Sequence, residues 1–176
     1  MPVYYTYLIS SLPMLQFFAK VPFSLEIFFN KCKNLIPDKE FEILRSACGT
    51  NNFFLDIQNN NSLKQWASFE IALRNELVHA RASRKKIDPL KFLHLPDAPQ
   101  AQISHVAMAA YRSTSIWEAE KMLDQARWNF LEDLSLGHYF DFDYLLIYGL
   151  KLRILERWDK IQKADKEYLL NRVVLN

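Results

Sequence analysis

Glycine is scarce in this chain, with 3 glycines among 176 residues. Neither the Gly-x-Gly-x-x-Gly loop of dinucleotide-binding folds nor the Walker A loop is present. Both loops depend on glycines that let the backbone approach a phosphate group closely. The commonest nucleotide-binding sites are therefore excluded.

Cysteine and long apolar runs are also scarce. Cys32 and Cys48 are too few for a disulfide scaffold, and neither has a Cys-x-x-Cys partner or an adjacent histidine. The N-terminal stretch lacks the positive region of a signal peptide, and Pro13 interrupts its apolar run. We therefore expect reduced thiols in a soluble, cytoplasmic protein that does not insert directly into a membrane.

Charge is nearly balanced overall but is arranged in blocks. The net charge is +2, so nothing in the global balance calls for nucleic acid as a partner. Residues 81–91 carry five bases against one acid, whereas residues 117–143 carry seven acids against two bases. Each block is interpreted either as a solvated helix face or as a docking surface that orients a partner. The candidate interface residues are Arg81, Arg84, Lys85, Lys86 and Lys91 in the basic block, and Glu118, Glu120 and Asp124 in the acidic block.

The apolar pattern predicts helices along most of the chain. Ser24 is a plausible N-cap for a helix over 25–35, a short helix follows over 40–47, and Ser62 opens a long helix to about residue 86. The long helix has a core-facing stripe, and a short alanine-rich helix follows over 101–112. Residues 3–12 fit either a short strand or the start of a buried helix, and the Asn-rich stretches near 50–61 predict surface turns.

The last third predicts two helices joined by a corner. Ser115 and Glu118 form a capping box at the start of the first helix, and Gly137 is its natural C-terminal residue. In the second helix, from about Asp143, one stripe is expected to face inward, formed by Leu145, Tyr148, Leu152, Leu155 and Trp158. We predict an all-α, irregular bundle of about six or seven helices, with a possible short N-terminal strand. It forms a single domain over 1–176, in which 115–176 is a long antiparallel helix pair.

The segment from Arg74 to His79 is the sharpest candidate for chemistry. An arginine followed five residues later by histidine resembles the R-x4-6-H signature of the HEPN superfamily of helical ribonucleases and nucleotide-binding modules. That resemblance implies metal-free RNA cleavage, with His79 moving protons and Arg74 stabilising the charge on phosphorus. The other interpretation is an exposed basic face of the long helix.

Metal and cofactor sites are not indicated. Glu76-x-x-His79 is half of a di-iron carboxylate motif, and no second copy exists. His94, His105 and His138 have no ligand spacing with one another or with the cysteines. His138 is expected to cap a helix end, and Asp141 and Asp143 to form an N-cap anchored by the rings of Phe140 and Phe142. We therefore expect no cofactor.

Two end segments resemble a specific bacterial family. They are Gly137 to Asp143 followed by Tyr148 to Trp158, and the start from Tyr4 to Leu15 with Phe23-Ser24 following. Both resemble an uncharacterised family encoded with V-type (V/A-type) ATPase operons. That family stands in the place of the all-helical subunit that connects the central stalk to the membrane rotor ring. The chain is shorter than family members are expected to be, so the resemblance implies a longer form with a further C-terminal portion.

The resemblance implies a non-enzymatic connector without catalytic residues. Its partners would be the central-stalk and membrane-rotor subunits of the V-type ATPase, with no nucleic acid, and the protein would be peripheral to the membrane through the complex. The scarcity of glycine, the abundance of packing residues and the blocks of charge favour the same class of protein. The alternative is a HEPN-like ribonuclease or nucleic-acid-binding module that uses Arg74 and His79.

Overall fold

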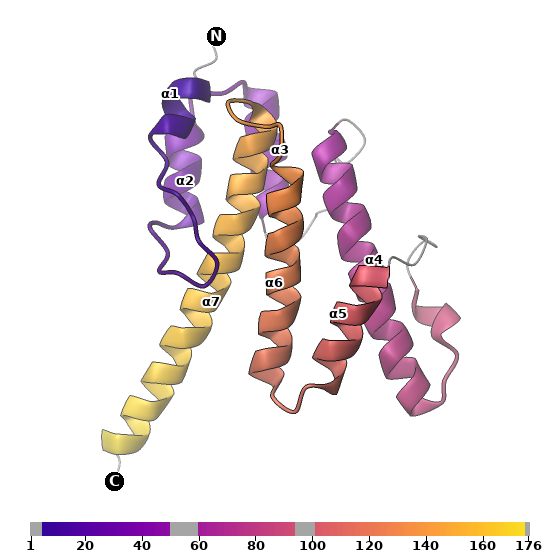
Figure 1. The fold of residues 1–176 in the computed structure, drawn as a ribbon. Helices are drawn as coiled ribbons and strands as arrows, with labels where there is room; N and C mark the ends of the chain where they lie inside the picture. The colour runs from indigo at the N-terminus through magenta and orange to yellow at the C-terminus, as the bar shows by residue number, and fades with distance from the viewer. Residues whose placement is uncertain (1–4, 50–59, 94–100, 175–176) are drawn as a thin grey trace. The chain divides into compact units, whose positions relative to one another are not determined.

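The protein is all-α in the computed structural model, which describes residues 5–49, 60–93 and 101–174, with side chains at 101 and 165–174 left out (Figure 1). Seven α-helices and one short 3-10 helix, but no strand, occur in these ranges. They are α1 (Tyr5–Ser10), α2 (Leu25–Cys32), α3 (Asp38–Cys48), α4 (Asn61–Lys85), η2 (Pro89–Phe92), α5 (Ala101–Arg112), α6 (Ile116–Leu134) and α7 (Phe142–Val174). The predicted bundle of six or seven helices is confirmed. The possible strand over 3–12 is wrong where the chain is described, because residues 5–10 form α1.

The chain divides into two compact units. The first comprises Met1–Phe53 and Ser135–Asn176, and the second comprises Phe54–Leu134. The first unit therefore holds α1, α2, α3 and α7, and the second holds α4, η2, α5 and α6. The single domain over 1–176 stays a prediction. So does the antiparallel pair over 115–176, because α6 and α7 belong to different units.

Local capping signals account for several helix starts. The Ser24 hydroxyl accepts a hydrogen bond from the Ile27 amide at 3.3 Å, and the Ser115 hydroxyl accepts one from the Glu118 amide at 3.3 Å, as predicted. The cap of α4 differs from the prediction. Asn60, rather than Ser62, accepts from the Leu63 amide at 2.8 Å, and Ser62 is buried inside the helix. The Asn-rich turns over 50–59 lie outside the described residues.

The core of the first unit is built on α7. The predicted inward stripe is confirmed, since Leu145, Tyr148, Leu152, Leu155 and Trp158 are each 5% exposed or less. Helices α2 and α3 pack against α7 (Figure 1). The segment before α2 follows the same helix, because the Tyr148 hydroxyl donates to the Pro13 carbonyl at 3.0 Å and the Phe18 ring meets the Trp158 ring edge-on at 5.2 Å. The Leu25 amide at the start of α2 donates to the Glu156 carboxylate at 2.7 Å.

Gly149 allows α7 to approach its neighbours closely. A Cβ atom at this position would lie 2.6 Å from the Cys48 sulfur and 3.1 Å from Cε1 of Phe28. Both neighbours are buried, on α3 and α2 respectively. A glycine in the middle of a helix costs about 1 kcal/mol relative to alanine. Here it creates the space in which the three helices meet.

The second unit packs α5 against both α4 and α6. The stripe predicted on α4 is buried at Trp66, Phe69, Leu73 and Ala80, whereas Leu77 is half-buried. Rings from α4 and α6 stack closely, with the centroids of Phe69 and Phe130 4.3 Å apart and their planes 14° apart. Aromatic contact of this kind adds to the free energy gained by burial. The stacked rings of Phe69 and Phe130 therefore join α4 to α6, while buried side chains of α5 such as Ile103 and Ala107 complete the core of this unit.

Candidate functional site

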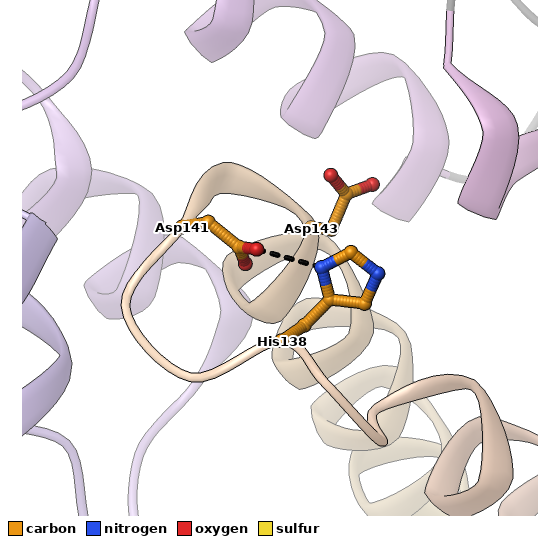
Figure 2. A group of neighbouring side chains, drawn as sticks. All are labelled: His138, Asp141 and Asp143. Carbon is orange, nitrogen blue, oxygen red and sulfur yellow. Dashed lines mark hydrogen bonds and ion pairs between the residues drawn. The ribbon is translucent and has the colours of Figure 1, made fainter.

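A polar cluster lies where α7 begins, after a corner that turns at Gly137. Gly137 has a φ of +91°, in the left-handed region that favours glycine. Asp141 is the N-cap of α7, because one of its carboxylate oxygens accepts from the Tyr144 amide at 2.9 Å. The other oxygen lies 2.6 Å from Nδ1 of His138, and Figure 2 shows these two side chains facing each other with Asp143 beside the imidazole. The predicted N-cap role of Asp141 is confirmed, whereas Asp143 lies within the first turn of α7.

The electrostatics of the corner favour a charged imidazole. The hydrogen bond to Asp141 is the largest effect and raises the pKa of His138. Burial lowers this pKa, and the negative charges of Asp141 and Asp143 raise it. The His138 side chain is 33% exposed. The expectation that His138 caps the end of the preceding helix is corrected, because its imidazole bonds to Asp141, the N-cap of α7.

The cluster extends to α1 and α3. The Tyr5 hydroxyl donates a hydrogen bond to the Glu40 carboxylate. Burial and the nearby negative charge of Asp143 raise the pKa of Glu40. Residues far apart in the sequence thus meet at this end of the first unit. Its three carboxylates are those of Glu40, Asp141 and Asp143.

The same residues have the donor types of a metal site. Ligand atoms of His138, Asp141 and Asp143 lie within 4.8 Å of one another. Both oxygens of Asp141 already accept hydrogen bonds, one from His138 and one from the helix amide. A cation would have to displace the bond between His138 and Asp141. The arrangement is accounted for by helix capping.

Exposed apolar side chains surround this polar corner. Leu136 is 76% exposed, Tyr139 is 67% exposed and Phe140 is 55% exposed. The expected anchoring role of the Phe140 ring is wrong, because more than half of its surface is in contact with solvent. We call Leu136, Tyr139, Phe140, Asp141 and Asp143 together the acidic corner.

A second exposed surface of opposite charge lies in the second unit, where α4 ends. Lys86 adopts a left-handed conformation with a φ of 54° and closes α4 through bonds to the carbonyls of Ala82 and Ser83. The chain then forms η2, which lies along the end of α4 (Figure 1). We call the exposed residues of this turn the basic tip: Arg84, Lys85, Lys86 and Lys91 with the apolar Ile87, Leu90 and Phe92. All five cations of the predicted basic block are exposed, including Arg81 one turn earlier.

The acidic interface candidates on α6 occupy different environments. Glu118 is exposed and Glu120 is half-buried. Asp124 is only 1% exposed, and its carboxylate forms an ion pair with Arg127 at 2.8 Å. The proposal that Asp124 lies on an exposed docking surface is therefore corrected, because the charge is buried and paired.

The ion pair of Asp124 belongs to a network that sequence reasoning missed. Arg127 also binds Glu70 on α4, with its Nε 2.7 Å from the carboxylate. The two carboxylates raise the pKa of Arg127 and outweigh the lowering effect of burial. This network ties α6 to α4 and leaves the guanidinium charged.

The structure places Arg74 and His79 on the same helix. Both are exposed and lie on the continuous helix α4. A spacing of five residues separates two side chains by about 140° around an α-helix. The helix therefore directs these side chains toward different sides. Glu76 is half-buried on the same helix and His105 is exposed on α5, while His94 lies outside the described residues.

The two thiols lie in the core of the first unit. Cys32 and Cys48 are free and buried. Burial raises the pKa of each thiol to about 12. Both side chains are therefore neutral at physiological pH and serve as small packing groups.

None of the helices in the described ranges combines the length and the apolar character that crossing a membrane requires.

Comparison with known proteins gives one family match. Residues 101–176, which contain α5, α6 and α7, match the model of a family described as a protein of unknown function (DUF2764). This match covers less than half of the chain. No curated protein and no solved structure matches it.

Proposed function

We propose that this chain is a non-enzymatic helical connector that links the central stalk to the membrane rotor of a bacterial V-type ATPase. A connector needs separate docking surfaces for different neighbours. The observation that carries the proposal is the presence of two such surfaces, one in each compact unit: the acidic corner and the basic tip. The assignment to an ATPase rests on the resemblance of the end segments to the family encoded in these operons.

Each surface has the composition of a protein contact. Both combine large exposed apolar side chains with charged groups. The acidic corner has Asp141 and Asp143 beside His138, and the basic tip has four cations beside Asp88. Apolar anchors supply most of the free energy of binding, while the surrounding charge sets orientation and the rate of association. Opposite charges would direct the two surfaces to different partners. The chain would then be cytoplasmic and attached to the membrane through the complex.

The helix packing suits a part that transmits torque. α7 is held by buried contacts to α2 and α3, and α6 is tied to α4 by the Arg127 network. Close-packed protein interiors resist compression and transmit strain. Each unit can therefore act as a rigid body between its neighbours.

The experiment is co-purification of the full chain with the ATPase subunits encoded beside it, using one variant for each surface. Reversing Arg84, Lys85 and Lys86 to glutamate should reduce association, more at low salt than at high salt, with little change in melting temperature. Replacing Leu136, Tyr139 and Phe140 with serine should remove a different subunit from the complex. Loss of the same subunit in both variants would contradict the proposal of two separate surfaces.

A matched control separates the basic tip from a general effect of charge. Reversal of Lys20, Lys33 and Lys39 changes the net charge by the same amount, and all three are exposed in the first unit. This variant should co-purify as the wild type does. Equal loss in the control would show that overall charge, rather than the basic tip, governs association.

The ribonuclease alternative has its own test. As a connector, the protein should show no metal-independent RNA cleavage that depends on Arg74 or His79, and His79→Ala should keep the helical content of the wild type. Cleavage of a single-stranded RNA by the wild type in the presence of EDTA, absent in His79→Ala, would overturn the proposed function.

A further inference from the structure

The basic tip presents apolar side chains to solvent at the end of a long helix. Leu90 is 73% exposed, Phe92 is 55% exposed and Ile87 is 46% exposed. All three lie within six residues of one another, on η2 and the turn before it. Large apolar side chains that gather on a surface in this way mark an interaction site.

Local structure holds this turn in place. Asp88 caps η2 by accepting a hydrogen bond from the Leu90 amide at 3.0 Å, and Pro89 fixes the first position of the turn. The left-handed conformation of Lys86 and the bond from the Ile87 amide to the Ala82 carbonyl, at 3.2 Å, set the direction in which the chain leaves α4. The apolar residues are therefore displayed by a defined turn that packs on α4.

The charge around these residues is almost entirely positive. Arg84, Lys85, Lys86 and Lys91 are exposed, and Arg81 lies one turn earlier on α4. None of these five cations forms a salt bridge within the described parts of the chain. Asp88, the acid among them, uses one carboxylate oxygen for the cap. The surface thus offers uncompensated cations beside apolar side chains.

We propose that the basic tip docks on the surface of an anionic lipid bilayer. The cations would bind the headgroups while Ile87, Leu90 and Phe92 enter the boundary between headgroups and acyl chains. Interfacial binding needs this combination of Lys and Arg with Leu and Phe, and each cation near an anionic surface adds about 1 kcal/mol, or roughly fivefold in partitioning. The tip would bind at the depth of the headgroups and would not cross the bilayer.

A bilayer fits the exposed turn better than a second copy of the chain or nucleic acid does. A projecting turn with three apolar side chains can enter a lipid interface without a preformed complementary pocket. Nucleic acid would use the cations but would leave the aliphatic Ile87 and Leu90 in water. A second copy could pair its acidic corner with the tip, but such a head-to-tail contact would build rings or open chains rather than a closed two-fold pair.

This inference goes beyond the proposed function and does not depend on it. The bilayer and a protein subunit would compete for the same tip, so in a connector the tip would be bound by lipid before assembly and by the subunit after it. Lipid binding would then raise the effective concentration of the chain beside the membrane rotor. The lipid experiment contains no ATPase subunit. Failure of lipid binding therefore leaves the connector proposal standing, and failure of co-purification leaves lipid binding standing.

The experiment is vesicle co-sedimentation of the full chain at low salt. The wild type should bind vesicles of phosphatidylcholine with phosphatidylglycerol and should not bind vesicles of phosphatidylcholine alone. Reversal of Arg84, Lys85 and Lys86 to glutamate should weaken binding by at least fiftyfold, from the fivefold effect of each cation. The matched reversal of Lys20, Lys33 and Lys39 should weaken binding by less than threefold.

A second variant tests the apolar residues. Leu90→Ser with Phe92→Ser keeps every charge and should weaken binding to anionic vesicles by at least tenfold. The exposed Met14, which is 87% exposed in the first unit, gives the control, since Met14→Ser should bind as the wild type does. Because all replaced side chains are exposed, each variant should keep the melting temperature of the wild type.

Three results would overturn the proposal. The first is absence of wild-type binding to anionic vesicles, and the second is equal loss in the matched charge control. The third is unchanged binding by the Leu90→Ser, Phe92→Ser variant. That result would reduce the tip to a general polycation, for which RNA or an acidic protein would serve equally well.

Discussion

Replacement of Gly149 with alanine tests the close approach of α7 to α2 and α3. The added Cβ would lie 2.6 Å from the Cys48 sulfur, about 1 Å inside the usual contact distance of 3.5–4.0 Å between nonbonded heavy atoms. Overpacking of a core costs about 1–3 kcal/mol, and the gain in helix propensity on replacing glycine with alanine offsets about 1 kcal/mol. We therefore expect a net loss of about 1 kcal/mol in the free energy of unfolding.

The effect of Gly149→Ala on the free energy of unfolding should change sign when the Cys48 sulfur is removed. In a Cys48→Ala background the closest clash disappears, and only the milder approach of Phe28, at 3.1 Å, remains. There the alanine at position 149 should be neutral or stabilise the helix by up to about 1 kcal/mol. The double-mutant cycle should thus give a coupling free energy of about 1–2 kcal/mol between positions 48 and 149.

Urea denaturation followed by far-UV circular dichroism measures these differences. If the two units unfold in separate transitions, only the transition of the first unit should shift. A stabilisation by Gly149→Ala in the wild-type background would refute the account, because it would show that the position tolerates a methyl group. Equal effects in the two backgrounds would show that Cys48 does not limit the space.

Three further predictions concern buried and charged groups. Trp158→Ala should lower the free energy of unfolding by about 3–5 kcal/mol, since this residue is 2% exposed. The control Trp117→Ala replaces a residue that is 40% exposed and should cost less than about 1 kcal/mol. Equal losses in the two variants would contradict the burial of Trp158. Arg127→Met should destabilise the protein by about 3 kcal/mol or more because it leaves the buried Asp124 without its cation, and addition of Asp124→Asn should recover most of the loss in urea denaturation. His138→Gln should lower the melting temperature more at pH 5.5 than at pH 9. Folding raises the pKa of this histidine, so the stabilisation that it provides is present below its unfolded pKa of about 6.5 and is lost as the pH rises through the folded value. A larger loss of melting temperature at pH 9 than at pH 5.5 would contradict the bond between His138 and Asp141.

Local signals in the sequence were enough to predict most helices. Ser24 and Ser115 identify helix starts because a cap acts on an amide three residues away, and the stripe on α7 reflects a fixed helical period. The start of α4 was misplaced by two residues, because the neighbouring Asn60 and Ser62 are both good caps. Only the bond to the Leu63 amide distinguishes them.

The polar corner could be predicted only in part. Asp141 caps the helix next to it, so its role follows from local chemistry. The contact of Glu40 with Tyr5, and its proximity to Asp143, join segments that are distant in sequence. The bond between Arg127 and Glu70 likewise spans 57 positions. No local pattern specifies such pairs.

Exposure was the property least accessible from the sequence. The alternation of Phe140 and Phe142 with aspartates predicted two anchoring rings, yet Phe140 is 55% exposed and Phe142 is half-buried. No sequence pattern predicts the apolar side chains of the basic tip, because Ile87, Leu90 and Phe92 together follow neither a helical nor a strand period. Gly149 did carry a signal, since an isolated glycine among good helix formers indicates a close contact.

Direct binding to the ATPase tests the central claim most closely. The full chain is mixed at low salt with the central-stalk and membrane-rotor subunits encoded beside it, and the products are separated by size-exclusion chromatography and weighed by native mass spectrometry. The connector account predicts a complex that contains the chain together with a subunit from each side. A chain that elutes alone in the presence of every one of these subunits would contradict the account.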